Sequence, residues 1–392
     1  MKHTGIICEY NPFHSGHLHL LDTVRAAGTK TVICLMSGHF TQRGEAAILP
    51  PAARAAMAMA AGADLVLELP FPYAAASARY FATAGVDALQ RLGADTVAFG
   101  SECADAARLS AAAARTLTED FEKKVANGAK NRGDAAVFFD ALGEERIGAN
   151  DILAVEYIRA VKRGGDRLAV YPVLREGAGY HDLSENVLHP SATALRESIF
   201  AGADIADRLP PCVQGVWREA AEARGFADTA RLGAPALAML RALCFQKDDT
   251  YAKNNAFLIA DCGGGLLERL QNAAVQADGY HSLCRAAATK KYTDGRIRRA
   301  LLYLLAGVTY ADLEAAPAYL RLLGANEQGR AFLSETRKTR TVPVVTKPAD
   351  ITALGETAVR QRALELTAAG LYALCLPCPT SMAALQLPPV LI

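Results

Sequence analysis

Short apolar runs alternate with segments of helical periodicity over the first half of the chain. An apolar run bounded by turn-forming residues is typical of a buried parallel strand. Such runs occur at residues 5–8, 31–36, 64–69, 96–100 and 168–173. Helical spacing is clearest at residues 51–62, 74–92 and 152–161. This alternation predicts an α/β fold with a doubly wound parallel sheet and right-handed crossovers.

The pattern changes after about residue 200, where helical periodicity dominates. Helices are predicted at residues 212–224, 235–244, 266–277, 296–305 and 316–323, with a last one at 357–369 that ends at Gly370. Residues 342–345 predict a small strand, placed at a sheet edge because Pro343 lacks a backbone donor. We therefore expect residues 1–200 to form the α/β domain and residues 201–392 to form a mostly helical domain.

Composition narrows the classes of function. The 392 residues are 51% hydrophobic and 21% charged with a net charge of +1, so a nucleic-acid-binding surface would have to be local. The first residues lead directly into a predicted strand, and no apolar run reaches the ~18 residues that span a bilayer. We therefore expect a cytosolic protein without a membrane segment. The nine cysteines are scattered, and the CxxC of Cys375 and Cys378 lacks two further zinc ligands.

Candidate chemistry lies where the first predicted strand passes into the first helix. His14-Ser15-Gly16-His17 occurs there, and open α/β sheets bind ligands at the carboxyl ends of their strands. The N–H groups of a helix N-terminus suit an anion, and Gly16 lets a ligand approach the backbone closely. His14 and His17 share one helix face, where both can donate hydrogen bonds to the α-phosphate of a nucleotide. The alternative is a helix cap with two surface histidines.

A second polar group opens a helix at the end of the α/β half. Ser191, Thr193 and Arg196 place two hydroxyls and a guanidinium on its first turns, where they could cradle phosphates or merely cap the helix. Together, HxGH and SxTxxR resemble the HxGH nucleotidylyltransferase superfamily. In that superfamily the first motif stabilises the α-phosphate, the second holds the β- and γ-phosphates, and pyrophosphate leaves.

Further motifs narrow the resemblance. They are EYNPFHSGH (9–17), MSGHFTQRGE (36–45), GADLVLELP (62–70), FGSE (99–102), NDILAVEY (150–157), GAGYHD (177–182), SATALRE (191–197), TKKYTDGRIRRALLYLL (289–305) and RLLGANEQGR (321–330). This ordered set is similar to the bacterial tRNA(Met) cytidine acetate ligase family over nearly the whole chain. His39 replaces an asparagine of the family pattern.

The resemblance implies a ligase that forms acetyl-adenylate from acetate and ATP, releases pyrophosphate, and acetylates N4 of the wobble cytidine of elongator tRNA(Met). It implies catalytic roles for His14, His17, Ser191, Thr193 and Arg196. It also implies ATP contacts by Ile7, Glu9, Tyr10, Asn11, Pro12, Phe13, Gly16, Gly100, Asn150 and Arg175. Mg²⁺ is expected on the triphosphate, although no carboxylate cluster in the sequence forms a dedicated metal site. The loop at 36–45 could close over acetate or present Gln42 and Arg43 to the nucleotide or tRNA.

A basic stretch in the helical half is the candidate tRNA-binding surface, since cations neutralise phosphates and an aromatic ring can stack on an unpaired base. Its residues are Arg285, Lys290, Lys291, Tyr292, Arg296, Arg298 and Arg299. A second basic cluster lies at residues 337–340, with Lys347 beyond it. A solvated helix face is the plainer interpretation. If the stretch binds only tRNA, reversing the charges of Arg298 and Arg299 weakens tRNA binding and leaves acetate-dependent ATP–pyrophosphate exchange intact.

Two other functions fit parts of the pattern. A small-molecule adenylyltransferase of coenzyme biosynthesis would use the same two phosphate motifs, but it would not need the basic helical half. A non-catalytic RNA-binding protein would need the basic half, but it would not need an intact HxGH.

Overall fold

The computed structural model describes residues 1–121, 123, 148–175, 191–244, 258–381 and 388–391. One mixed sheet organises them, in the strand order β5-β4-β1-β2-β3-β6-β7, with β8 also pairing with β6. Its first five strands in this order are parallel neighbours. The strands are β1 His3–Cys8, β2 Thr31–Ser37, β3 Leu65–Leu69, β4 Thr96–Ser101, β5 Ala169–Leu174, β6 Leu320–Ala325, β7 Val344–Val345 and β8 Val390–Leu391. The predicted doubly wound parallel sheet is confirmed.

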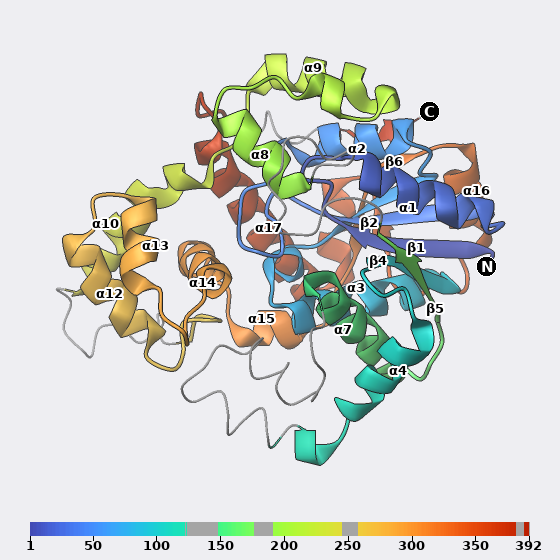
Figure 1. Ribbon diagram of the computed structural model, residues 1–392, viewed down its shortest axis with the longest axis horizontal. Coiled ribbons are helices and arrows are strands. Elements are labelled where there is room, and N and C mark those ends of the chain that lie inside the picture. Colours follow the sequence, from blue (N-terminus) through green and yellow to red (C-terminus); the bar gives the residue numbers. More distant parts are fainter. Residues whose placement is uncertain (122, 124–147, 176–190, 245–257, 382–387, 392) are drawn as a thin grey trace.

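Helices cover both faces of the sheet (Figure 1). On one face pack α1 Ser15–Ala26, α2 Pro51–Ala60, α8 Ala192–Phe200 and α9 Pro211–Arg224. On the other face pack α3 Ala78–Leu92, α4 Ala106–Arg115, α7 Ala149–Arg163 and α16 Glu327–Glu335. The two apolar cores, one on each face, bury the alternate side chains of β1 and β2, which explains why these strands read as continuous apolar runs.

The helical region packs against the loops that follow β2 and β3. It contains α10 Gly233–Cys244, α12 Leu266–Gln276, α13 Tyr280–Ala287, α14 Asp294–Ala306, α15 Tyr310–Glu314 and α17 Glu356–Cys375. The Tyr303 hydroxyl donates to the Ala75 carbonyl oxygen at 3.0 Å, and the Tyr73 hydroxyl donates to the Ala315 carbonyl oxygen at 2.7 Å. Phe40 and Phe71 join the core of the helical region, so the two halves are held in one orientation.

Two details of the second half differ from the prediction. Residues 316–323 were expected to be helical, but residues 320–325 form β6, which pairs antiparallel with β3. The helix expected to end at Gly370 continues to Cys375 as α17. The short strand at Val344–Val345 is confirmed at the sheet edge. A division of the chain into two domains near residue 200 stays a prediction. In the structure β6 and α16, which come from the second half of the chain, pack with the sheet of the first half.

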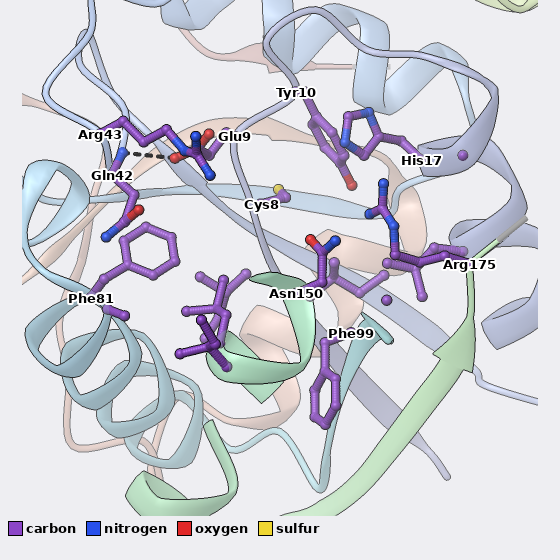
Figure 2. Close-up of a pocket in the computed structure, with 18 of the residues that line it drawn as sticks. Cys8, Glu9, Tyr10, His17, Gln42, Arg43, Phe81, Phe99, Asn150 and Arg175 are labelled. Carbon is purple, nitrogen blue, oxygen red and sulfur yellow. Dashed lines mark hydrogen bonds between the residues drawn. The ribbon is translucent and has the colours of Figure 1, made fainter. Parts of the chain in front are cut away.

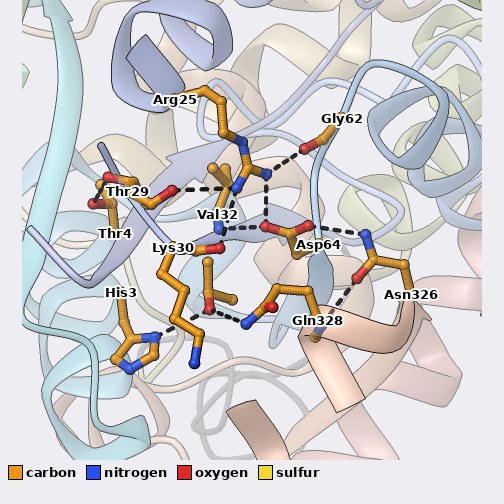
Figure 3. A network of polar contacts seen from close by, with 12 residues as sticks. His3, Thr4, Arg25, Thr29, Lys30, Val32, Gly62, Asp64, Asn326 and Gln328 are labelled. Carbon is orange, nitrogen blue, oxygen red and sulfur yellow. Dashed lines mark hydrogen bonds and ion pairs between the residues drawn. The ribbon is translucent and has the colours of Figure 1, made fainter. Parts of the chain in front are cut away.

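The side chain of Asp64 links β6 and α16 to the first half of the sheet (Figure 3). Its Oδ2 accepts hydrogen bonds from the Val32 backbone N–H at 2.8 Å and from Arg25 Nη2 at 2.6 Å, and its Oδ1 accepts from Asn326 Nδ2 at 2.8 Å. Asn326 is also the N-cap of α16, where its Oδ1 accepts from the Gly329 N–H. The motifs at 62–70 and 321–330, far apart in sequence, therefore meet at the amino end of β3.

Candidate active site

A cavity of about 680 Å³ lies at the carboxyl ends of β1, β4 and β5 (Figure 2). Strand order runs outward in both directions from β1 and β4, so the cavity lies at the point where open α/β sheets bind ligands. Residues of α1, α3 and α7, of the loop after β2 and of the start of α14 also line it, together with Ser191. Its volume suits a nucleotide-sized ligand.

His14 and His17 lie at the start of α1 with their rings stacked, 3.8 Å between centroids. His14 is the N-cap residue, and its Nδ1 accepts a hydrogen bond from the Gly16 N–H at 3.0 Å. His17 Nδ1 accepts from the His14 N–H at 3.2 Å. Because both Nδ1 atoms act as acceptors, each neutral ring carries its proton on Nε2. The cap and the catalytic interpretations are therefore compatible, since the cap bond uses Nδ1 and the proposed donor is Nε2–H.

The pKa of His17 is held well below its usual value by burial, and electrostatic interactions with His14 and Arg175 lower it further. Tyr10 packs edge-on against the His17 ring, with 4.9 Å between centroids. A neutral imidazole at this position donates one hydrogen bond without carrying a full charge. His17 is therefore suited to bind a phosphoryl oxygen over the whole neutral pH range.

The second motif opens α8. Ser191 is its N-cap residue, with Oγ accepting from the Ala194 N–H at 3.2 Å, and it lines the cavity. Thr193 and Arg196 are not among the residues of the cavity wall. Arg196 donates to the Asn11 carbonyl oxygen at 2.8 Å and to Thr193 Oγ1 at 3.4 Å, which ties α8 to the segment before α1.

The predicted ATP-binding residues fall into two groups. Ile7, Glu9, Tyr10, Gly16, Gly100, Asn150 and Arg175 line the cavity. Asn11, Pro12 and Phe13 are buried outside its wall, and their contribution is to shape the turn between β1 and α1. The Asn11 Oδ1 accepts from the Ile48 N–H at 2.7 Å, which fixes this turn against the loop before α2.

Two carboxylates lock the FGSE and NDI segments together. Glu102 accepts hydrogen bonds from Asn150 Nδ2 at 2.6 Å and from the Asp151 N–H at 2.8 Å. In return Asp151 accepts from the Glu102 N–H at 2.9 Å and from the Cys103 N–H at 3.2 Å. Glu102 uses one of the two N–H donors of the Asn150 amide, and it fixes the orientation of the amide in the cavity wall. A Cβ at Gly100 would lie 3.2 Å from Arg175 Cγ, so the glycine admits this arginine to the cavity.

The basic stretch does not behave as one surface. Arg298 and Arg299 line the same cavity as His14 and His17, which does not fit the expectation that they act on tRNA alone. Tyr292 is 8% exposed and its hydroxyl donates to the Gly264 carbonyl oxygen, so the ring has no face available to stack on a base. Lys291 and Arg296 lie over that ring and donate to backbone carbonyl groups. Arg285 and Lys290 are exposed.

Sequence reasoning missed Arg54, a fully buried arginine of α2. It donates to the carbonyl oxygens of Leu49 at 3.0 Å, Glu9 at 2.5 Å and Ser37 at 3.0 Å, and also to that of Gly38. These bonds tie the ends of β1 and β2 together behind the cavity. The sequence signal for it was a single arginine in an otherwise apolar, alanine-rich helix. Such a helix is expected to be buried, and a buried charge has to be hydrogen-bonded.

His39, after β2, provides a test on stability. It is buried, its Nε2 has no hydrogen-bond partner among the described residues, and burial together with Arg321 and Arg54 holds its pKa well below 6.5. The unfolded chain therefore binds a proton that the folded protein excludes, and the free energy of unfolding falls as pH drops below 6.5. His39→Asn should reduce this slope by about 1.4 kcal/mol per pH unit between pH 6 and 5. Urea unfolding at several pH values measures it, and equal slopes in both proteins would contradict it.

No group of three or more metal-ligating side chains occurs in the described parts of the chain. The nine cysteines are unpaired; Cys375 is buried in α17 and Cys378 is exposed. Among the residues that the structure describes, no helix is both long enough and apolar enough to cross a membrane. The GAGYHD motif lies outside the described residues.

Comparison with known proteins agrees with this geometry. A family model described as HIGH nucleotidyl transferase matches residues 1–385. The tRNA(Met) cytidine acetate ligase of Syntrophotalea carbinolica is 36% identical over 369 residues, covering 88% of this chain and 85% of the relative. That of Acetivibrio thermocellus is 32% identical over 407 residues, covering 96% and 95%.

Two crystal structures of Thermotoga maritima TmcAL are similar over all of this chain. The apo form has a TM-score of 0.88 at 28% identity and is covered over 100% of its length. The form bound with α-thio ATP has a TM-score of 0.86 at 27% identity and is covered over 99%.

Proposed function

The chain belongs to the tRNA(Met) cytidine acetate ligase family of HIGH nucleotidyl transferases, and we propose that it activates acetate with ATP and acetylates the wobble cytidine of elongator tRNA(Met). The observation that carries this proposal is the convergence of HxGH and Ser191 of SxTxxR on one cavity at the sheet's switch point. A related enzyme of the same fold has been seen with an ATP analogue.

In the first step an acetate oxygen attacks the α-phosphorus of ATP, and the bond from that phosphorus to the bridging oxygen of the β-phosphate breaks. Negative charge grows on the α-phosphoryl oxygens and on the leaving pyrophosphate. The Nε2–H groups of His14 and His17 donate hydrogen bonds to the α-phosphoryl oxygens. The N-terminus of α8, with Ser191, Thr193 and Arg196, binds the leaving pyrophosphate. The protein contributes position and charge stabilisation. Mg²⁺ arrives with the triphosphate as part of the substrate.

In the second step the cytidine N4 attacks the carbonyl carbon of acetyl-adenylate. The bond between the acetyl carbon and the AMP oxygen breaks, AMP leaves, and N4 releases a proton to water. The same His14 and His17 donors remain on the phosphate that departs with AMP, so one site serves both steps.

Acetate-dependent ATP–pyrophosphate exchange, followed by transfer of labelled acetate to tRNA, tests the proposal. Exchange that requires acetate, with transfer to elongator tRNA(Met), supports it. Exchange independent of acetate would favour a small-molecule adenylyltransferase, and the absence of exchange would favour a non-catalytic RNA-binding protein.

The exposed residues Arg285 and Lys290 are the remaining candidates for tRNA contacts within the basic stretch. Changing both to glutamine should weaken tRNA binding and reduce the slope of log affinity against log salt by roughly 1.5 to 2, the value for two lost phosphate contacts. Filter binding at several salt concentrations measures this. The control is Lys30→Gln, an exposed lysine at the amino end of β2, opposite the cavity. Exchange needs no tRNA, so its parallel loss would contradict the assignment of these residues to tRNA.

A further inference from the structure

The carboxylate of Glu45 lies between two arginines from different halves of the chain. Its Oε2 is 3.5 Å from Arg196 Nη2 in α8, and its Oε1 is 3.4 Å from Arg298 Nη1 in α14. All three side chains are mostly buried, with exposed fractions of 24%, 18% and 26% respectively. Both separations exceed the 2.7–2.9 Å of a close charge-assisted hydrogen bond. One carboxylate thus spans two guanidinium groups without a close fit to either.

The surroundings favour an anion larger than a carboxylate. The charges of Glu9, Glu45, Arg196 and Arg298 all act on Arg43, so three arginines and two glutamates lie near one another. Arg298 lines the cavity, and Glu45 and Arg196 border it through their contacts with one another and with Arg298. The formal charges of the three arginines and two glutamates sum to +1, while a nucleoside triphosphate carries several negative charges. Arg196 donates to the Asn11 carbonyl oxygen at 2.8 Å, while Arg298 has a longer contact, 3.4 Å, with the Arg43 carbonyl oxygen. The Arg196 guanidinium is therefore held in place whether or not Glu45 lies beside it.

We propose that the gap between Arg196 and Arg298 binds the terminal phosphates of ATP and the departing pyrophosphate, and that Glu45 occupies this gap when they are absent. Arg298 is then a phosphate-binding residue contributed by the helical half. The inference rests on the nucleotide site of the proposed function, but it depends on neither acetate nor tRNA.

The loop that carries Glu45 packs tightly on α14. Gly44 has φ +72°, a conformation that L side chains rarely adopt, and a Cβ at this position would lie 2.8 Å from the Arg299 nitrogen. The backbone of the loop is thus fixed against α14. The Glu45 carboxylate would therefore leave the gap by rotation of its side chain, without movement of the loop. When the triphosphate binds, its terminal phosphates replace the Glu45 carboxylate between Arg196 of α8 and Arg298 of α14. The contact between the two halves of the chain is therefore kept.

Calorimetric titration of the full chain with Mg²⁺ and α,β-methylene-ATP, and separately with AMP, tests this inference. AMP lacks the terminal phosphates, so it reports disturbance of the adenosine end alone. Arg298→Gln should weaken binding of the triphosphate analogue about 10-fold and leave AMP affinity unchanged, and Arg298→Lys should restore part of the loss. Glu45→Gln should tighten the analogue about 3-fold, again without effect on AMP, because an internal competitor has lost its charge.

Other outcomes would overturn the inference. Equal weakening of the analogue and AMP by Arg298→Gln would indicate a structural role, and no change in either would return Arg298 to the tRNA surface. Weaker analogue binding by Glu45→Gln would make the carboxylate a positioning group. The exposed pair Arg218 and Asp207 provides matched controls, Arg218→Gln and Asp207→Asn. Wild-type exchange that does not depend on acetate would refute the proposed function. The affinities for the analogue and for AMP would still test the role of Arg298 and Glu45, because neither measurement involves acetate or tRNA.

Discussion

Replacing His14 with asparagine is expected to reduce acetate-dependent ATP–pyrophosphate exchange at least about 100-fold while the thermal stability of the protein stays close to that of the wild type. The reason is that the two nitrogens of the imidazole ring have different roles. Its Nδ1 caps α1 by accepting from the Gly16 N–H, and in the proposed mechanism its Nε2–H is the donor to the α-phosphate. Losing one preorganised donor to a developing phosphoryl charge costs about 10²–10³-fold in rate.

Asparagine separates these two roles because it is among the best N-cap residues and cannot reach as far as Nε2. His14→Ala should lose exchange to the same extent and also lose about 1 kcal/mol of stability through the missing cap. Exchange rates and unfolding midpoints of both variants measure this. His281→Ala, at an exposed histidine of α13, is the control. Asparagine at position 14 with near wild-type exchange would remove His14 from the catalytic machinery.

Where the chemistry lies could be predicted because local signals agree there. An apolar run, a turn at Asn11-Pro12 and a polar group at a helix start follow one another within 15 residues, and the carboxyl ends of parallel strands gather at one edge. Gly100 and Arg175 were predicted from the family resemblance rather than from this rule, and both line the cavity at strand ends.

Residues 320–325 show where local pattern fails. The segment Leu320-Arg-Leu-Leu-Gly-Ala fits a helix as well as a strand, because a short apolar run does not distinguish the two. Its partner is β3, about 250 residues earlier in the chain, and pairing to that edge decides the outcome. Likewise, α17 continues through Gly370 because its apolar side chains pack in the helical core, which outweighs the weak helix propensity of glycine.

The basic stretch shows a different limit. A charge pattern says which residues are cationic, not which way they point. Lys290 is exposed, Arg298 faces the nucleotide cavity and Arg296 caps backbone carbonyls, although all three lie within ten residues. Only the packing of α14 against the loop at 36–45 separates these roles, and that contact joins residues about 250 positions apart.

Arg54→Met is expected to destabilise the protein by about 3 to 5 kcal/mol, the largest stability effect anticipated here. Methionine keeps much of the apolar volume but satisfies none of the carbonyl oxygens of Leu49, Glu9, Ser37 and Gly38. Each buried acceptor left without a donor costs about 1–3 kcal/mol, and water cannot replace the guanidinium because the site is fully enclosed. Urea unfolding followed by circular dichroism measures the change.

Arg25→Met is the matched comparison, because Arg25 also donates to several backbone carbonyls, those of Thr29, Lys30 and Gly62, and pairs with Asp64. Its side chain is 41% exposed, so water can take over these acceptors and the loss should be about 1 kcal/mol. Equal losses in the two variants would show that burial of the acceptors is not what makes Arg54 important. A larger loss at Arg54 would establish that the ends of β1 and β2, and with them Glu9 in the cavity wall, are held from behind by one buried guanidinium.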